Sequence, residues 1–262
     1  NPSSGTASIC GHDVLTQGLA ARQRLGYLPE GAPCYAEMTP ASFLSFIAEI
    51  RGLRGNKYRS RLNEVIERLH LEPVLNQTID TLSKGFKRRV GLAQAILHDP
   101  DVLILDEPTD GLDPNQKHEV RELIRSMSAE KLIVISTHIL EEVEAVCSRA
   151  IIIAQGKILA DDATNKLARK SRYHNAVRIS VGAGGNIEQV QAALATLDSV
   201  ATTKIERQRT ITAFSKPESA DMDVWREVTD LVNTGDWNIE GIELESGRLE
   251  DYFRQITQGE HA

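Results

Sequence analysis

Two adjacent carboxylic acids, Asp106 and Glu107, are the residues of this sequence best suited to chemistry. They follow the apolar run Val102-Leu103-Ile104-Leu105, which predicts a parallel strand buried on both faces. Open parallel sheets bind ligands at the carboxyl ends of their strands. There Asp106 could hold Mg²⁺ directly or through water, while Glu107 could polarise an attacking water. Taken alone, the pair could equally be two solvated acids at a strand end.

A second candidate is the segment Leu82-Ser83-Lys84-Gly85-Phe86. Ser83 is placed to cap a helix whose first N–H groups and dipole favour an anion. The first turn carries four cations: Lys84, Lys87, Arg88 and Arg89. Because cations oppose the dipole at this end, we expect them to face an anionic ligand or an acidic partner. A capped helix with a solvated basic face is the plainer alternative.

The order of these motifs resembles the ATPase subunit of ATP-binding cassette (ABC) transporters. The matching residues are Leu82 to Phe86 as the signature loop, Val102 to Glu107 as the Walker B strand followed by Pro108-Thr109, Gly111-Leu112-Asp113 as the D-loop, and His138 after Ser136-Thr137 as the switch histidine. Four motifs in one order are far more specific than any one of them. The resemblance extends from Asn1 to about Asp162.

This resemblance implies a transport-coupled ATPase whose cofactors are ATP and Mg²⁺. Asp106 and Glu30 would hold the metal. Glu107 would be the general base, and His138 would bond the γ-phosphate and the attacking water. The implied nucleotide-binding residues are Ser83, Lys84, Gly85, Phe86 and Asp113, at the interface with a second, head-to-tail subunit. Without the other motifs, His138 would be taken for a cap after the strand at 132–135.

Three departures from the family pattern stand out. Glu30 follows Gly26-Tyr27-Leu28-Pro29 where the family usually has Gln, and Ser-Lys-Gly-Phe replaces Ser-Gly-Gly-Gln in the signature. Both also resemble subunits of exporter, gliding-motility or copper-maturation systems, so we do not interpret them as inactivation. No G-x-x-x-x-G-K-[ST] phosphate loop occurs in the sequence. We expect this loop to precede Asn1, and we expect residues 1–262 alone to be inactive.

The resemblance also implies partners. A membrane-spanning permease and a second ATP-binding subunit, as in a homodimer, would place the protein in the cytoplasm, peripheral on the inner face of the cell membrane. Residues 39–81 would form the helical insertion that docks the permease. Met38, Phe43, Phe46 and Tyr58 would supply its apolar surface, unless Phe43 and Tyr58 only pack its helices together. The alternative function is a non-hydrolytic regulatory or scaffold cassette, or a non-transport ABC protein.

The resemblance implies that a P-loop NTPase-type α/β fold positions these residues. Apolar periods predict helices at Pro40–Arg51 and Lys57–His70 within a helical subdomain at about 39–98. Alternating strands and helices from 102 to 146 predict a parallel sheet. A hairpin at 150–160 would close a cassette domain at 1–165, followed at 161–175 by a helix that becomes a linker.

A separate α+β domain is predicted at 174–262. Its expected elements are strands at 176–181, 202–206, 210–214 and 237–242, and helices at 187–197, 224–232 and 249–257. Taken in chain order, the elements before the last helix follow the ferredoxin-like strand-helix-strand-strand-helix-strand order.

Composition excludes other classes. The chain has 262 residues, with 30 Lys and Arg against 37 Asp and Glu, a formal net charge of −7. This charge argues against a nucleic-acid partner. No apolar stretch approaches the roughly 18 residues of a membrane span. Three cysteines with no metal-ligand spacing argue against a disulfide framework or a zinc site and favour a reducing compartment.

Overall fold

The computed structural model describes residues 2–32, 34–206, 209–219 and 222–258, so the last four residues of the predicted α+β domain lie outside the described chain. The chain divides into two compact units, Asn1–Ile139 and Leu140–Ala262. We describe each unit by itself. Within the described ranges, no helix is both long and apolar enough to cross a lipid bilayer.

A three-stranded parallel sheet forms the centre of the first unit. Its order is β3 (Leu25–Leu28), β4 (Val102–Asp106) and β5 (Leu132–Ser136). Leu28, Leu103 and Leu105 are fully buried. Val102 and Ile104, on the other face of β4, are only partly buried, so the predicted full burial is found on one face of the strand and not on both. The register sets Asp106 opposite Ser136, so β4 and β5 end side by side. The predicted parallel sheet is therefore confirmed for these strands.

The chain before this sheet forms only short elements. Strand β1 (Ser8–Ile9) pairs with β2 (His12–Asp13) in a tight hairpin. Cys10 and Gly11, both with positive φ, form its turn. Helix α1 (Gly18–Gln23) then leads into β3.

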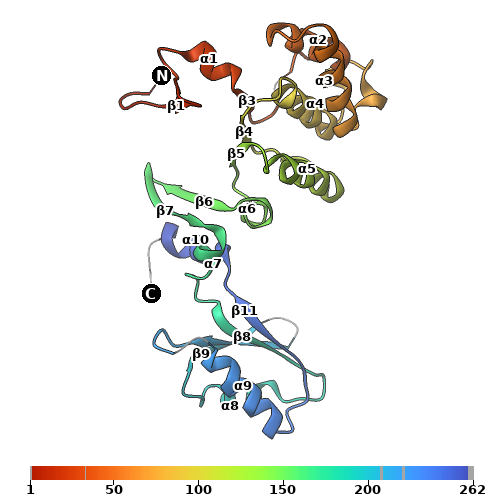
Figure 1. Ribbon diagram of the computed structural model, residues 1–262. Coiled ribbons are helices and arrows are strands. Elements are labelled where there is room, and N and C mark those ends of the chain that lie inside the picture. The colour runs from red at the N-terminus through yellow and green to blue at the C-terminus, as the bar shows by residue number, and fades with distance from the viewer. Residues whose placement is uncertain (1, 33, 207–208, 220–221, 259–262) are drawn as a thin grey trace. The chain divides into compact units, whose positions relative to one another are not determined.

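Helices gather on one side of the first unit (Figure 1). These are α2 (Pro40–Ile50), α3 (Gly55–Arg68) and α4 (Lys84–Ile96), with short turns η1 (Glu72–Val74) and η2 (Ile79–Thr81) between α3 and α4. Thr39 caps α2 in a reciprocal capping box with Ser42, and Pro40 occupies the first turn. Helix α5 (Pro114–Met127) joins β4 to β5. The predicted helices at 40–51 and 57–70 are present with small differences at their ends.

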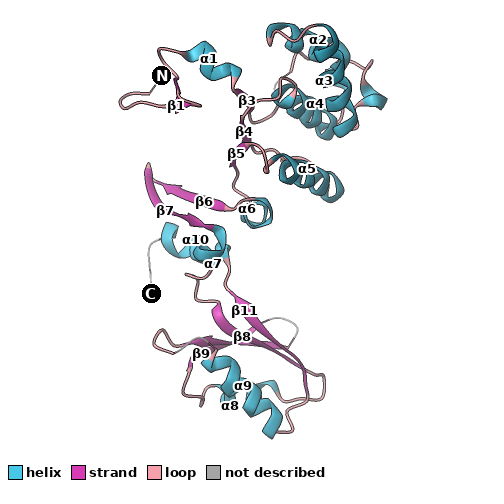
Figure 2. Ribbon diagram, viewed as in Figure 1, coloured by secondary structure: helices cyan, strands magenta, loops and turns pink. Residues whose placement is uncertain are grey.

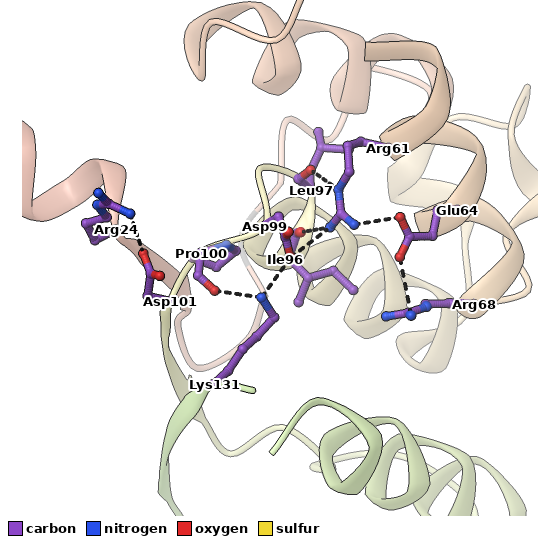
Figure 3. Close-up of polar contacts among 10 residues, drawn as sticks. All are labelled: Arg24, Arg61, Glu64, Arg68, Ile96, Leu97, Asp99, Pro100, Asp101 and Lys131. Atoms are coloured by element: carbon purple, nitrogen blue, oxygen red, sulfur yellow. Dashed lines mark hydrogen bonds and ion pairs between the residues drawn. The ribbon is translucent and has the colours of Figure 1, made fainter. Parts of the chain in front are cut away.

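Polar contacts join α3, the end of α4 and the start of β5 (Figure 3). Arg61 donates to the carbonyls of Ile96 and Leu97 at 2.8 and 3.2 Å, which satisfies carbonyl groups that the end of α4 leaves free. Lys131, just before β5, pairs with Asp99 at 2.7 Å. This hydrogen bond lowers the pKa of Asp99. The segment between α4 and β4 is therefore bonded both to α3, through Arg61, and to the start of β5, through Lys131.

The second unit begins with α6 (Leu140–Val146) and the hairpin β6 (Arg149–Ala154) and β7 (Lys157–Ala163). Residues 161–163 continue β7, and only α7 (Thr164–Ala168) is helical, so the helix predicted from 161 to 175 is wrong beyond one short turn. Arg149 holds Asp161 in the hairpin at 2.6 Å, which extends the strand. The terminal helix α10 (Leu249–Gln258) packs on this group through Leu249, 1% exposed.

A four-stranded antiparallel sheet completes the second unit. In chain order, this region consists of β8 (His174–Val181), α8 (Ile187–Leu194), β9 (Val200–Glu206), β10 (Thr210–Ser215), α9 (Asp223–Thr234) and β11 (Ile239–Ser246). The strand order is β11-β8-β10-β9, and both helices cover one face (Figure 2). The predicted order of elements is present. The domain boundary that the sequence analysis places between 165 and 174 stays a prediction. The structure groups residues 140–168 with the four-stranded sheet, in the unit Leu140–Ala262.

Several predicted boundaries in this part of the chain are wrong; for example, β11 continues to Ser246, whereas the prediction ended at 242. Strand β11 begins at Ile239 rather than Trp237, because the indole N–H of Trp237 donates to the carbonyl of Leu231 at 3.0 Å and the ring packs on α9. Helix α8 ends at Leu194 rather than Leu197, where the chain turns toward β9. The N–H of Val200 then bonds the carbonyl of Leu197 at 3.2 Å.

Candidate functional site

The acidic pair lies where β4 ends. The backbone N–H of Glu107 donates to the carbonyl of Ser136 at 2.9 Å, which carries the β4–β5 pairing one residue past the strand. Glu107 has a φ of +46°, in the left-handed region, at a backbone cost of about 1 kcal/mol or more. This turn makes the chain leave the sheet directly after Asp106. Strain of this kind clusters at functional sites.

The end of β5 holds both carboxylates. Ser136 donates its hydroxyl to Oδ1 of Asp106 at 2.5 Å, and Thr137 donates its hydroxyl to Oε2 of Glu107 at 3.1 Å. The backbone N–H of His138 lies 3.0 Å from Oε1 of Glu107, and its ring Nδ1 lies 2.7 Å from the same oxygen. Glu107 is therefore a half-enclosed acceptor, with 15% of its side chain exposed, against 76% for His138.

The signature segment begins α4. Ser83 accepts the N–H of Phe86 at 3.3 Å, so the predicted N-cap is confirmed. A Cβ atom added at Gly85 would lie 2.5 Å from Oε1 of Gln116, so the first turn of α4 packs closely on α5. Ser83 and Lys84 are exposed, Gly85 is buried and Phe86 is half-buried.

The D-loop segment is fixed by α5. Asp113 is the N-cap of this helix and accepts the N–H of Gln116 at 2.9 Å, with Pro114 next to it in the first turn. Gly111 has a φ of +72°, and a Cβ added there would lie 3.4 Å from Cδ of Lys84. The loop after the acidic pair therefore runs beside the start of α4. Thr109, within that loop, is 1% exposed.

Two cations near the start of α4 have partners within the chain. Lys87 donates to the carbonyl of Asp80 at 2.8 Å, and Arg89 pairs with Glu119 at 2.7 Å. For Arg89 the partner is acidic, and neither cation needs an anionic ligand to account for its position. Arg88 is buried and faces acidic residues of the chain itself. Lys84 is exposed at the beginning of the helix.

The metal residues predicted from the sequence do not form a preassembled cage. Glu30 is exposed on the loop after β3, and Asp106 is held by Ser136. Within the described part of the chain, no group of three or more His, Cys, Asp or Glu side chains could hold a metal ion. A single hydroxyl-supported carboxylate fits Mg²⁺, which keeps several waters and is often bound through one or two carboxylates plus substrate phosphates.

Sequence reasoning did not assign roles to Ser136 and Thr137, although both hydroxyls contact the acidic pair. The available signal was their position: they end a strand parallel to β4, and the carboxyl ends of such strands lie at one edge. It also missed the distinct position of Arg88, because a run of four cations gives no indication of which one is buried.

The fold is that of an α/β ATP-binding cassette. A solved chain described as the ATP-binding subunit of an ABC transporter matches with a TM-score of 0.60 and 31% identity, over 65% of this chain and 71% of that chain. A family model described as ABC transporter matches residues 1–110.

Two curated relatives agree with this. The ABC transporter ATP-binding protein NatA of Bacillus subtilis is 33% identical over 173 residues, which cover 65% of this chain and 70% of the relative. The chain belongs to the ABC transporter family. Nod factor export ATP-binding protein I of Burkholderia orbicola is 38% identical over 168 residues, 64% of this chain. The match spans only 55% of that relative.

Proposed function

We propose that the protein hydrolyses ATP with Mg²⁺ as the ATP-binding subunit of an ABC transporter, and that residues 1–262 supply its acidic pair, switch histidine and signature. The observation that carries this proposal is the Glu107 carboxylate held by Thr137 and His138. A carboxylate oriented in this way can accept a proton from a water positioned beside it.

Each residue at the ends of β4 and β5 has a separate role in this proposal. Glu107 accepts the proton of the attacking water, while Thr137 and His138 fix its orientation. His138, largely exposed, can also bond the γ-phosphate and that water. Asp106, oriented by Ser136, would hold Mg²⁺, with Glu30 as a further carboxylate. When bound, Mg²⁺ would neutralise charge on the phosphate oxygens.

The signature would act on a nucleotide held by another subunit. Ser83 and Lys84 lie exposed at the beginning of α4, and Asp113 is exposed at the beginning of α5. Free N–H groups at a helix N-terminus favour phosphate. With Gly85 and Phe86, these residues would face a second copy in a head-to-tail homodimer. The protein would then carry two nucleotides at one interface.

The edge of β5 supports an additional strand. It is an outer strand of the described sheet, and its side chains Leu132 and Val134 are 64% and 48% exposed. The backbone N–H and C=O groups along the outer side of an edge strand are a template for pairing with another strand, and the exposed side chains show that the described chain leaves one face of β5 open. We place the predicted phosphate-loop strand beside β5, so that its loop would meet the ends of β4 and β5.

A docking surface for the permease is offered by α2 and the loop before it. Tyr35, Phe46 and Ile50 are exposed by 51%, 38% and 64%. The ring of Tyr35 packs edge to face against the rings of Phe43 and Phe46, with ring centroids 6.1 and 5.7 Å apart. Phe43 is only 4% exposed, and Tyr58 bonds Ser45 at 2.9 Å, so these two pack the helices together. Aromatic residues of this kind are enriched at interface centres. Through this partner the protein would sit on the inner face of the membrane.

The phosphate loop gives the cheapest test of this function. Residues 1–262 alone should show no micromolar affinity for MgATP in calorimetry, because the signature contacts only the far side of a nucleotide held elsewhere. The same chain with the predicted strand and loop joined ahead of residue 1 should bind. Micromolar binding by residues 1–262, or none by the extended protein, would contradict the proposed arrangement.

A further inference from the structure

Arg88 occupies an unusual position for a charged side chain. It lies in the second turn of α4 and is only 4% exposed. Its guanidinium donates to the carbonyl of Pro29 at 3.3 Å, directly before Glu30. Buried arginines are rare unless they are paired. The neighbouring Arg89 differs, because it reaches across to Glu119 on α5.

The bond from Arg88 is one of a series along β3. Gln94 donates to the carbonyl of Tyr27 at 2.6 Å, and Nε2 of His98 donates to the carbonyl of Leu25 at 3.1 Å. Because the carbonyl of Arg24 accepts from Val102 of β4, the carbonyls of residues 25, 27 and 29 point to the opposite edge. Side chains of α4 and of His98 just after it thus cover the outer edge of β3.

Two glycines hold α4 in this register. A Cβ atom added at Gly26 would lie 2.2 Å from the carbonyl oxygen of Ala95. One added at Gly91 would lie 2.7 Å from Cβ of Ala32 and 2.9 Å from Leu28. Helix and strand are therefore in close contact along their length, and the start of α4 and the Glu30 loop are fixed to each other.

Four carboxylates act on the charge of Arg88. Burial lowers the pKa of its guanidinium, whereas Asp110, Glu107, Asp106 and Glu30 act in the opposite direction. Three of them, Asp106, Glu107 and Glu30, are the carboxylates to which the proposed function gives roles toward Mg²⁺ and the attacking water beside a polyanionic nucleotide. Like charges gathered at one site repel an anion unless cations balance them.

We propose that Arg88 is a positioning residue that fixes the Glu30 loop to the signature helix and offsets the charge of Glu30 beside the acidic pair. This inference rests on the proposed function, since it concerns the site where MgATP would bind. A purely structural arginine would instead contribute stability alone. The two roles differ in how Arg88 and Glu30 depend on each other.

The test is a double-mutant cycle in the protein that carries the phosphate loop. The variants are Arg88→Gln, Glu30→Gln and both together, with Arg88→Lys to keep the charge and Arg89→Gln as the matched control. We expect Arg88→Gln to weaken MgATP affinity about tenfold and the added Glu30→Gln to restore most of it. Arg88→Lys should retain more affinity than Arg88→Gln, and Arg89→Gln should leave affinity unchanged.

A second readout needs no nucleotide. Chemical denaturation of the same set should show that Arg88→Gln destabilises less when Glu30 is already Gln. Independent, additive effects of the two substitutions on both affinity and unfolding would overturn the inference. Failure of the unsubstituted protein to bind MgATP would instead refute the proposed function, and the unfolding cycle would still decide the role of Arg88.

Discussion

The ring Nδ1 of His138 lies 2.7 Å from Oε1 of Glu107, and the backbone N–H of His138 reaches the same oxygen at 3.0 Å. One residue thus contacts the acidic side chain through both its backbone and its ring. Since a carboxylate only accepts, Nδ1 carries the proton in this contact. The ends of β4 and β5 are thereby joined at the place where the proposed chemistry occurs.

This contact predicts that His138 contributes to hydrolysis more than to stability. In the protein with its phosphate loop, His138→Ala should lower ATP turnover about 10²-fold or more, because the base loses its orienting donor. Its melting temperature should change little, since the side chain is 76% exposed. Steady-state phosphate release checks turnover, and Thr137→Val is the companion variant. A fully active His138→Ala enzyme would exclude the role.

Gly26 should tolerate no side chain. Its Cβ would overlap the Ala95 carbonyl, a backbone atom that cannot move aside cheaply. We expect Gly26→Ala to reduce the free energy of unfolding by roughly 2–4 kcal/mol. Gly241→Ala is the control, because nothing lies within 4 Å of the atom it would add. Equal effects of the two substitutions in urea denaturation would show that α4 and β3 are not in this close register.

Asp99 should make stability depend on pH. The hydrogen bond from Lys131 lowers its pKa below the usual 3.8, so its contribution is present above that value and is lost as the pH falls through the lowered pKa. Asp99 is 52% exposed, so we expect less than about 1 kcal/mol. Asp99→Asn should therefore lose stability at pH 7 and differ little from the unsubstituted protein near pH 2. A constant difference across this range, in denaturation at each pH, would contradict the assignment.

The surface formed by α2 and the loop before it should bind the permease. Glu37→Arg and Glu49→Arg change exposed charges beside Tyr35 and Ile50, and they should reduce co-purification with the permease without lowering the melting temperature. Glu130→Arg, an exposed site after α5, is the control. Cross-links to the permease found only within residues 176–262 would show that docking occurs elsewhere.

Local patterns predicted the elements that position the site. The run at 102–105 predicted β4 because a continuous apolar run is typical of a strand in a parallel sheet, and Ser83 predicted the cap of α4 because few residue types can accept at that position. The assignment of catalytic, metal and nucleotide roles remains a prediction from the family resemblance.

What the sequence did not predict depends on contacts between distant segments. The return of α10 to α6 is one such contact: Glu144 accepts the N–H of Leu249 at 3.0 Å, across more than a hundred residues. No periodicity within either helix reveals that pairing. Likewise, the four cations near the start of α4 look alike in sequence, and only packing against the Glu30 loop buries Arg88 while leaving Lys84 exposed.

Substitution of Glu107 tests the central claim most directly. In the protein that carries its phosphate loop, Glu107→Gln keeps the shape and much of the hydrogen bonding of the side chain but removes its capacity to take a proton. We predict unchanged nucleotide affinity and a loss of hydrolysis of about 10²- to 10⁴-fold, measured as single-turnover phosphate release. Near-normal hydrolysis by the Glu107→Gln protein would contradict the account.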